Sequence, residues 1–272
     1  MDNTKHDFID LFDQYFEVVP ADTSERLLEC YRLRYEVYCR EGILPGNKVD
    51  DYSNGLEYDE YDKHSVQCLL IHKPKQIAIG TVRIILADPE NPEKKLPLEA
   101  VAGDLLISDF LSLKSLRPHL GEISRLILIP EFRARKGENQ RPYGVSDNFE
   151  SLLQTNGQRR QSNTSWQSQD HHEEIPRRIF PHAIIGLFVA VMRMSVEHNL
   201  TYWVGTMEPI FARFLRSFGI DFKPITPILD YHGLRQGFIG YIPDIIENIY
   251  RVNSQLWSLL TGNGAIFKHP PK

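Results

Sequence analysis

Helical spacing of apolar residues is the first pattern along the chain. The segment 21–42 carries apolar and aromatic residues three and four positions apart, which predicts an amphipathic helix. The residues on its expected face are Leu27, Tyr31, Arg34, Tyr35 and Tyr38. Asp22 followed by Glu25 resembles a capping box, and Gly42 suits the end of the helix.

Three segments rich in branched aliphatic residues predict β-strands. Residues 66–72 and 76–86 are expected to form two strands, joined by a Lys-Pro-Lys turn. Gly80 inside the second indicates a bulge or a close backbone approach. The third strand, 121–129, opens with Glu-Ile-Ser-Arg and continues in aliphatic residues. A short helix is expected between the second and third strands, near 98–106.

The second half of the chain alternates helical and strand patterns. Residues 182–198 predict a strongly apolar helix, 201–206 a strand, and 208–219 an amphipathic helix. A turn at Gly233 then separates two further strands. Helices and strands therefore alternate throughout, which predicts one α/β domain over residues 1–272 with a mixed central sheet flanked by helices.

One segment departs from these patterns. From residue 137 to 176, 15 of 40 residues are Ser, Gln or Asn, and only 7 are Val, Ile, Leu, Phe, Trp or Tyr. Such a composition does not build a core layer. We therefore expect 137–176 to be a mobile insertion or a lid within the domain.

Composition narrows the possible partners and the location. The net charge of −5 gives no global reason to expect binding to nucleic acid or to a membrane. No apolar run approaches the roughly 20 residues that span a bilayer. The N-terminal stretch is acidic and amphipathic and has no apolar signal-peptide core. We therefore expect a cytoplasmic protein without stable membrane insertion.

Cysteine and histidine offer little chemistry. Cys30, Cys39 and Cys68 form no CxxC pair and are expected to be reduced, structural thiols. The pair His171-His172 stands alone in a polar stretch and is expected to be solvated rather than to bind a metal. No metal site is therefore predicted.

Charged residues in apolar surroundings mark the candidate site. Each has an ordinary explanation if it is taken singly. Arg34 could extend its head to solvent from an apolar helix face, Asp59 and Asp62 could belong to a solvated loop, and Arg83 and Arg125 could lie on an exposed face of their strands. Taken together, they can neutralise one another in a partly buried site, as buried charges require.

The ordered set of these charged groups resembles a family pattern. In chain order the set consists of Arg34 and Tyr38, Asp59 and Asp62, Gly80 and Arg83, and Glu122, Ser124 and Arg125. It resembles the acyl-homoserine-lactone (autoinducer) synthases, a branch of the GNAT acyltransferases. The longer phrases LRYEVYCREG, TMEPIFARFLRSFGIDFKPI and YHGLRQGFIGYI resemble a sister group, the PEP-CTERM/exosortase-system-associated acyltransferases, which are related to N-acyl amino acid synthases.

The resemblance implies a GNAT-like fold and an N-acyltransferase. A medium- or long-chain acyl group would move from a thioester to the amine of an amino acid or a related small molecule. Glu122, Ser124 and Arg125 would be catalytic, with Glu122 as the general base. The expected substrate-binding residues are Arg34, Tyr38, Asp59, Asp62 and Arg83. In a regular strand Glu122 and Arg125 face opposite sides, so a shared site requires a β-bulge.

The acyl donor is expected to be a thioester of acyl carrier protein or of coenzyme A, with no tightly bound cofactor. The GNAT phosphate-binding motif Q/R-x-x-G-x-G/A is poorly matched by EFRARKGENQRPYG, which favours the carrier protein. The candidates to bind the carrier protein are Arg133, Arg135, Arg177 and Arg178. An ordinary solvated loop rich in basic residues would have the same sequence pattern. Phe188 and Trp203 would line the acyl tunnel; ordinary core packing is the alternative.

Two other functions fit parts of this pattern. One is an acyl-homoserine-lactone synthase that uses S-adenosylmethionine. The other is a non-catalytic binding module with a GNAT fold. Intact Glu122 and its partners favour an enzyme over a binding module.

Overall fold

The structure is a computed structural model that describes residues 8–42, 52, 54–106, 113–133, 180–231 and 233–267. The insertion expected at 137–176 lies outside the described residues, and so do Arg135, Arg177 and Arg178. Among the described helices, none is long and apolar enough to cross a lipid bilayer.

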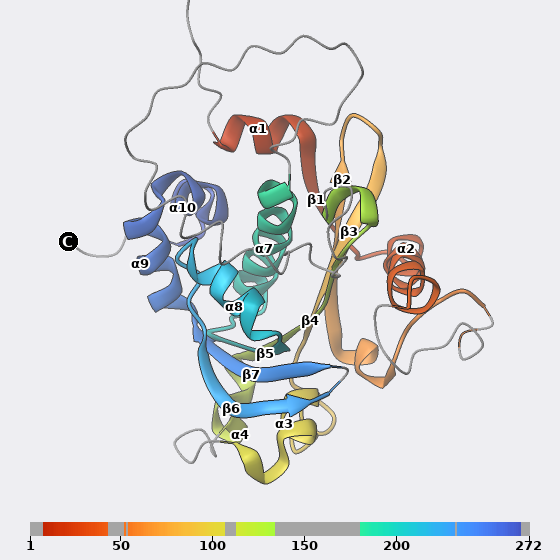
Figure 1. Cartoon of the computed structure of the whole chain (residues 1–272), viewed down its shortest axis with the longest axis vertical. Coiled ribbons are helices and arrows are strands. Elements are labelled where there is room, and N and C mark those ends of the chain that lie inside the picture. The colour runs from red at the N-terminus through yellow and green to blue at the C-terminus, as the bar shows by residue number, and fades with distance from the viewer. Residues whose placement is uncertain are drawn as a thin grey trace, which may run out of the picture.

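A mixed sheet of seven strands forms the centre of the molecule (Figure 1). The strands are β1 (Phe16–Pro20), β2 (Ser65–His72), β3 (Ile77–Ile85), β4 (Leu120–Leu128), β5 (Tyr202–Met207), β6 (Lys223–Asp230) and β7 (Leu234–Tyr241). Their order in the sheet is β1-β2-β3-β4-β5-β7-β6. Strands β4 and β5 run parallel, and every other neighbouring pair is antiparallel.

Helices surround this sheet on both faces. The longer ones are α1 (Phe8–Tyr15), α2 (Ser24–Tyr35), α7 (Phe180–Glu197), α8 (Pro209–Arg216), α9 (Ile242–Val252) and α10 (Ser254–Thr261). Short helical segments are η1 (Glu36–Arg40), η3 (Glu60–His64), α3 (Pro97–Ala102), η4 (Gly103–Leu105), α4 (Leu113–Leu116), η6 (Arg117–His119) and α5 (Pro130–Arg133). Three of these short segments, η1, η3 and α3, contribute residues to the site described below.

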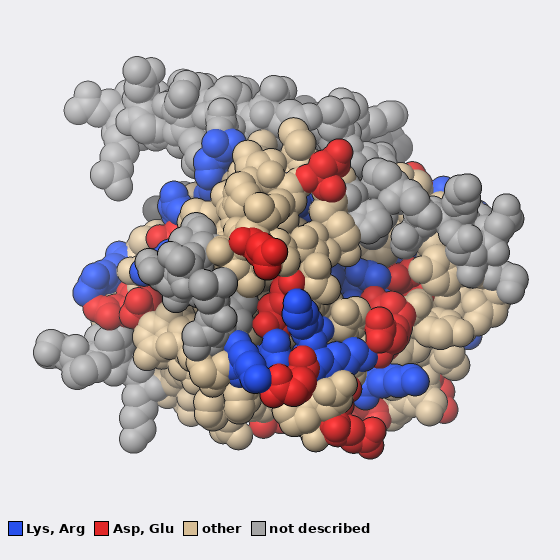
Figure 2. Space-filling model, turned by 90° about the horizontal axis from the view of Figure 1, so that it is seen from below, with Lys and Arg blue, Asp and Glu red and all other residues tan. Residues whose placement is uncertain are grey.

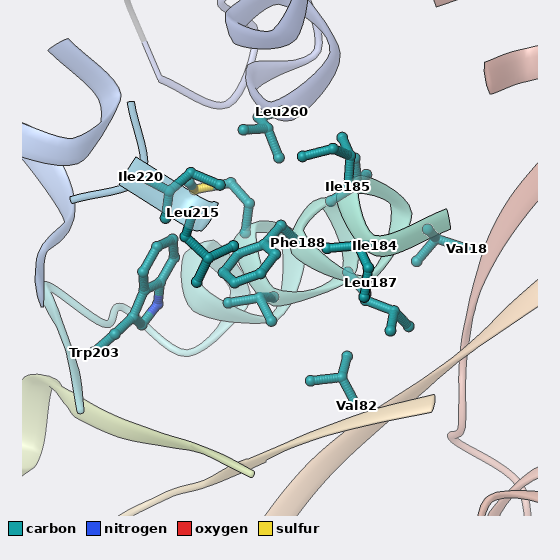
Figure 3. Packing of buried hydrophobic residues seen from close by; sticks show 14 of the residues in the cluster. Val18, Val82, Ile184, Ile185, Leu187, Phe188, Trp203, Leu215, Ile220 and Leu260 are labelled. Atoms are coloured by element: carbon teal, nitrogen blue, oxygen red, sulfur yellow. The ribbon is translucent and has the colours of Figure 1, made fainter. Parts of the chain in front are cut away.

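Alternation along β2 separates two layers of core. Cys68 and Leu70 pack with α7, whereas Leu69 packs with α2 on the opposite face. The apolar side chains of α7 meet Trp203 of β5 and Leu215 of α8 in one cluster (Figure 3). A third cluster joins β5, β6 and β7 to the start of α3. The site therefore lies among strands that are covered on both faces.

Most of the predicted elements are present, with differences at their ends. The helix expected over 21–42 is an α-helix only as far as Tyr35, and it continues as the π-helix η1. Thr23, rather than Asp22, caps its N-terminus and accepts from the Arg26 N–H; the Asp22 carboxylate instead pairs with the Arg26 side chain. The predicted capping box at Asp22 is therefore wrong by one residue.

Gly80 fulfils both expectations for a glycine inside a strand. The β2–β3 register shifts at this point, since Leu70 pairs with Gly80 and Ile71 pairs with Ala78. A side chain could not be added there, because a Cβ would lie 2.5 Å from the Ile127 carbonyl oxygen of β4. Gly80 therefore lets β3 and β4 approach closely, next to the expected site.

Candidate active site

Strands β4 and β5 separate soon after they meet. Their pairing covers only Leu120–Tyr202, Gly121–Trp203 and Glu122–Val204. Beyond Glu122, the edge of β4 that faces β5 has no ladder partner in the described sheet. The two strands therefore diverge, and Glu122 stands at the point where the divergence begins.

A bulge in β4 brings Glu122 and Arg125 to one site. On β3, two steps lead from Thr81 to Arg83, but three steps on β4 lead from Ile127 to Ser124, so β4 carries one extra residue. Arg125 has a φ of 51°, in the left-handed region that non-glycine residues rarely adopt. The bulge that was required for a shared site is thus present, and both side chains line one cavity.

This cavity lies in the opening between β4 and β5 and has a volume of about 190 Å³. Its polar wall includes Tyr38, Asp59, Tyr61, Arg83, Glu122, Ser124, Arg125, Thr206, Tyr231 and Arg235. Its apolar wall includes Ile123, Leu126, Phe188, Met207, Phe211 and Phe222. The lining therefore combines charged groups with aromatic and aliphatic side chains.

Two arginines on one side of the cavity share a buried glutamate. The Nε atoms of Arg34 and Arg125 both donate to Glu57, and Nη2 of Arg125 adds a bond to Oε1 at 2.8 Å. Arg34 also grips Asp62 with two parallel bonds of 2.7 and 3.0 Å. Arg34 and Glu57 are fully buried, so this pairing is what makes their charges tolerable inside the protein.

Arg83 completes the network from β3. Its guanidinium holds Asp59 through bonds of 2.7 and 3.0 Å, and its Nη1 lies 3.0 Å from Asp62. Its Nε donates to Ser124 Oγ at 2.9 Å, across the β3–β4 pair. Arg125 reaches the same Asp59 at 2.9 Å. Ser124 therefore orients Arg83, and three guanidinium groups balance three carboxylates.

Pairing keeps the acids of this network ionised. Burial by itself opposes ionisation of Asp62, but the hydrogen bonds and charge of Arg34, with the charge of Arg83, outweigh burial and lower the Asp62 pKa to about 2. Burial also opposes ionisation of Glu57, where Arg125 and Arg34 prevail and lower the pKa. The network is thus a neutral, rigid support for the cavity wall.

Glu122 has a different environment. Its side chain is buried and takes no direct part in the ion pairs, and burial raises its pKa to about 8. The Leu98 N–H and the charge of Arg83 oppose this rise only in part. A carboxyl group with such a pKa, at the edge of a cavity, can accept and return a proton near neutral pH.

The predicted site residues divide by position. Tyr38, Asp59, Arg83, Glu122, Ser124, Arg125 and Phe188 line the cavity. Arg34 and Asp62 lie behind the lining residues, with side chains that are 0% and 6% exposed, and support them. The π-helix η1 sets the direction of Tyr38, whose ring lies 5.5 Å from the Arg125 guanidinium carbon. The motif residues therefore form one connected structure.

Two expected donor-binding residues lie elsewhere. Arg133 is fully buried and pairs with Glu41, so it is no part of an exposed basic surface. Trp203 is a core residue: its Nε1 donates to Ser195 Oγ at 2.7 Å, and its ring faces Phe188 and Phe222. The structure thus corrects both assignments, because α5 turns Arg133 inward and β5 points Trp203 into the α7 side of the core.

Charge on the described surface is mixed. Figure 2 shows basic and acidic side chains lying against one another near the centre of one face, rather than a patch of one sign. Within the described ranges, no group of three His, Cys, Asp or Glu side chains could hold a metal ion. The three cysteines are buried, and burial raises the pKa of Cys30 to about 11 and of Cys68 to about 12.

Several residues of the site have no signal in the sequence. Glu57, which supports the wall without lining it, lies in the run EYDEYD, two positions before Asp59, and its spacing does not distinguish it from Glu60. Arg235 and Phe222 come from β7 and from the segment before β6, about 100 residues after Glu122. Only the sheet order, which places β5 beside β4, β7 beside β5 and β6 beside β7, brings them to the cavity.

Comparison with known proteins agrees with this architecture. A family model described as an acetyltransferase (GNAT) domain matches residues 33–140, which include every charged residue of the network. No curated protein sequence matches the chain. The fold is similar to that of FeeM, an N-acyl amino acid synthase from uncultured soil microbes, with a TM-score of 0.50 and 13% identity over 86% of this chain and 93% of that chain.

A second solved structure gives a similar result. It is TofI in a ternary complex with an inhibitor and MTA, with a TM-score of 0.51 and 13% identity over 93% of this chain and 99% of that chain. At these identities the similarity establishes the fold, and it confirms the predicted mixed α/β architecture of the GNAT type. With the GNAT domain at residues 33–140, the comparisons support an acyltransferase.

Proposed function

We propose that the protein is an N-acyltransferase that moves a medium- or long-chain acyl group from a thioester to the amine of an amino acid or a related small molecule. One observation carries the proposal: a buried carboxyl group with a raised pKa, Glu122, lies at the opening between β4 and β5 and lines a cavity with a polar and an apolar wall. The apolar wall supports the proposal of a medium or long acyl chain, and the arginines of the polar wall support an acceptor that carries a carboxylate.

The proposed reaction uses Glu122 as the base. The acceptor nitrogen attacks the thioester carbonyl while the Glu122 carboxylate accepts the proton of the amine, directly or through a water molecule. The tetrahedral intermediate then collapses: the C–S bond breaks, the C–N bond remains, and the thiolate leaves and takes up a proton. Backbone N–H groups on the unpaired edge of β4 beyond Glu122 are suited to stabilise the oxyanion.

Arginine side chains in the polar wall are suited to an acceptor that carries a carboxylate. The donors of Arg83 are directed to Asp59, Asp62 and Ser124, so this residue supports the acids. Arg125 lines the cavity with its side chain 23% exposed, and Arg235 lines it from β7. We assign the acceptor carboxylate to Arg235 and Arg125. Arg235 lines the cavity, and a guanidinium fork can bind a carboxylate through two bonds. By contrast, Nε and Nη2 of Arg125 already hold Glu57 and Asp59, so Arg125 would contribute mainly its charge.

Aromatic side chains in the apolar wall fit an acyl chain. Phe188, Phe211 and Phe222 come from α7, α8 and the segment before β6, and Met207 ends β5. An acetyl group needs little of this surface. Burial of each further methylene is worth about 0.8 kcal/mol, so the preference should rise roughly fourfold per carbon until the wall is covered.

The deciding experiment compares donors. We would measure kcat/KM for acyl groups of two to sixteen carbons, each presented on acyl carrier protein and on coenzyme A, with a panel of amino acids as acceptors. We expect medium or long chains to be preferred, with the carrier protein as the better donor. A preference for acetyl-CoA would overturn the proposal and indicate a small-molecule N-acetyltransferase.

The same assay separates a second candidate. The ordered motif set from Arg34 to Arg125 is also compatible with an acyl-homoserine-lactone synthase. That activity would require S-adenosylmethionine and would release a lactone, whereas an N-acyl amino acid synthase would act on amino acids alone. Mass spectrometry of the products distinguishes the two.

Cellular context is a further part of the proposal. We place the protein in the cytoplasm as a single domain, within the PEP-CTERM/exosortase-associated group. The three long phrases that resemble this group support the assignment. A strain that lacks the protein should lose an acylated small molecule from its lipid extract if this placement is correct.

A further inference from the structure

The carboxyl group of Glu122 is held by one backbone amide. The Leu98 N–H donates to its two oxygens, at 3.1 and 2.9 Å, and among the described residues these are the hydrogen bonds that the Glu122 side chain makes. Leu98 is the second residue of α3, after Pro97, which has no N–H. The first amides of a helix have no acceptor within the helix, so the Leu98 N–H is available for this contact.

A buried ion pair fixes the helix that carries this amide. Glu99 reaches back to the Leu96 N–H at 2.9 Å, and Arg117 grips Glu99 through bonds of 3.2 and 2.7 Å. Arg117 also donates to the Pro92 carbonyl oxygen at 2.9 Å. Both charged side chains are less than 10% exposed. Since Arg117 lies three residues before β4, it ties the first turn of α3 to the strand that bears Glu122.

The other side of Leu98 is fixed by β7. A Cβ at Gly237 would lie 2.6 Å from Leu98 Cδ1 and 2.8 Å from Thr226 Cγ2. Thr226 Oγ1 accepts the Gly237 N–H at 2.8 Å, which holds this part of β7 in place. The absence of a side chain at Gly237 therefore makes room for Leu98 in the position where its amide meets Glu122.

We propose that Glu99, Arg117 and Gly237 form a clamp that holds the Leu98 N–H against Glu122 and thereby tunes the basicity of this carboxyl group. The inference rests on the proposed function, because it concerns the proposed general base. None of the three residues lines the cavity, so they are positioning residues. They act on the reaction only through the amide of α3.

Several groups face Glu122 from the elements packed around it. Arg83 on β3 and Arg125 on β4 favour its ionised form, whereas Glu99 on α3 disfavours it. Tyr61 on η3 also lies near enough to be affected by the Glu122 charge. Because Arg117 neutralises Glu99, the loss of Arg117 and the loss of the Glu99 charge have electrostatic effects of opposite sign on the Glu122 titration.

Infrared spectroscopy can follow this titration without any substrate. The C=O stretch of the protonated Glu122 carboxyl group is the band that disappears in Glu122→Gln, and its loss with rising pH gives the titration midpoint. We expect the midpoint to rise by about one pH unit in Gly237→Ala, which displaces Leu98 without a change of charge and so tests the clamp by itself, and in Arg117→Met, where the loosened amide and the unneutralised Glu99 act in the same direction. Glu99→Gln loosens the clamp, which raises the midpoint, and removes a nearby negative charge, which lowers it, so its midpoint should lie below that of Arg117→Met. Arg117→Lys should lie between wild type and Arg117→Met.

The control is Arg216→Met, which removes a surface pair with Asp221 far along the chain from Glu122. Its midpoint should equal that of wild type. Midpoints that stay at the wild-type value in folded Gly237→Ala and Arg117→Met would overturn the clamp. Circular dichroism on the same samples shows whether each variant is folded, and if one of the two unfolds, the other decides.

Failure of the clamp and failure of the proposed function give different results. If Glu122→Gln transfers acyl groups at the wild-type rate while the midpoints shift as expected, the clamp stands and the assignment of the base falls. If Glu122→Gln is inactive but the midpoints do not move, the base stands and the clamp falls. A purely structural role would lower the stability of the variants and leave the midpoints unchanged.

Discussion

Buried carboxyl groups at this site fall into two environments. Asp62 and Glu57 are held by guanidinium groups, which lower their pKa values, to about 2 for Asp62. Glu122, on β4, is buried without an ion pair, and its pKa rises to about 8. The same physical factor, burial, opposes ionisation in both places, and only the partners differ.

This difference distinguishes the carboxylates that support the cavity wall from the carboxyl group that can take part in proton transfer. A carboxylate that is paired with two arginines stays ionised and gives a fixed shape, but it is a poor base because its proton affinity is low. A carboxyl group that is buried beside a single amide changes its charge near neutral pH. The network therefore shapes the cavity, while Glu122 is able to move a proton there.

The largest expected effect comes from replacing Glu122, the buried carboxyl group without an ion pair. Glu122→Gln keeps the shape of the side chain and its acceptor for the Leu98 N–H, but the amide cannot act as a base. The rate of acyl transfer should fall 10²- to 10⁴-fold, which is typical for loss of a general base. Single-turnover rates measure the change, with Glu60→Gln, an exposed acid, as the control. A rate within about threefold of wild type would assign the proton transfer to another group.

The next effect tests the first environment. Arg34→Met removes a guanidinium group and leaves Glu57 and Asp62 buried with too little positive charge. We expect the free energy of unfolding to fall by about 3–5 kcal/mol, as when one partner of a buried pair is removed. Chemical denaturation measures it. Arg40→Met, which removes an exposed pair with Glu36, is the matched control and should have little effect. Equal losses in both variants would contradict a supporting role for the network.

The two environments should also respond to pH in opposite ways. Asp62 has a lowered pKa in the folded state, so its contribution to stability is present above its unfolded pKa of 3.8 and is lost as the pH falls towards 2. Because the pKa of Glu122 is raised in the folded state, Glu122 there still holds its proton at pH values at which the unfolded chain has released it. The free energy of unfolding therefore falls as the pH rises from 4.5 to about 8.

Denaturation curves at several pH values separate these contributions. The Glu122 contribution has a slope of at most about 1.4 kcal/mol per pH unit, and it should vanish in Glu122→Gln. Asp62→Asn should flatten the acid limb below pH 4 and leave the alkaline limb unchanged. If Glu122→Gln had the same alkaline limb as wild type, the raised pKa of Glu122 would be disproved.

The sequence predicts the charged half of this site well, because its residues come in short motifs. The motifs group Arg34, Asp59, Asp62, Arg83 and Arg125, and the structure joins these five residues in one network. Even the bulge follows from the sequence, since two residues three apart on a strand cannot otherwise share a side. The spacing of the motifs therefore predicts nearly all of the supporting network.

The sequence predicts neither the remaining elements of the fold nor the far side of the cavity. Strand β1 was missed because Phe16–Pro20 is too short to show a period, and α9 and α10 were not anticipated after the last strand pair, although none of the three lines the cavity. Arg235 and Phe222 reach the cavity through the position of β7 beside β5, which is a property of topology. Leu98 acts through its backbone amide, which no side-chain pattern reveals.

The smallest expected effect distinguishes an arginine in the wall from the arginines in the network. Arg235 lines the cavity from β7, whereas Arg34 lies wholly behind the wall. Arg235→Met should therefore raise KM for a carboxylate-bearing acceptor about tenfold, as expected when a hydrogen bond to a charged group is lost, and change kcat and stability little. Arg235→Lys keeps the charge but not the fork, so it should restore part of the affinity. Steady-state kinetics with an amino acid and with its amide as acceptors test this directly: the variant should lose its defect with the amide, which has no carboxylate to bind. An equal defect with both acceptors would show that Arg235 supports the wall in the way that Arg34 does, and would leave Arg125 as the acceptor-binding arginine.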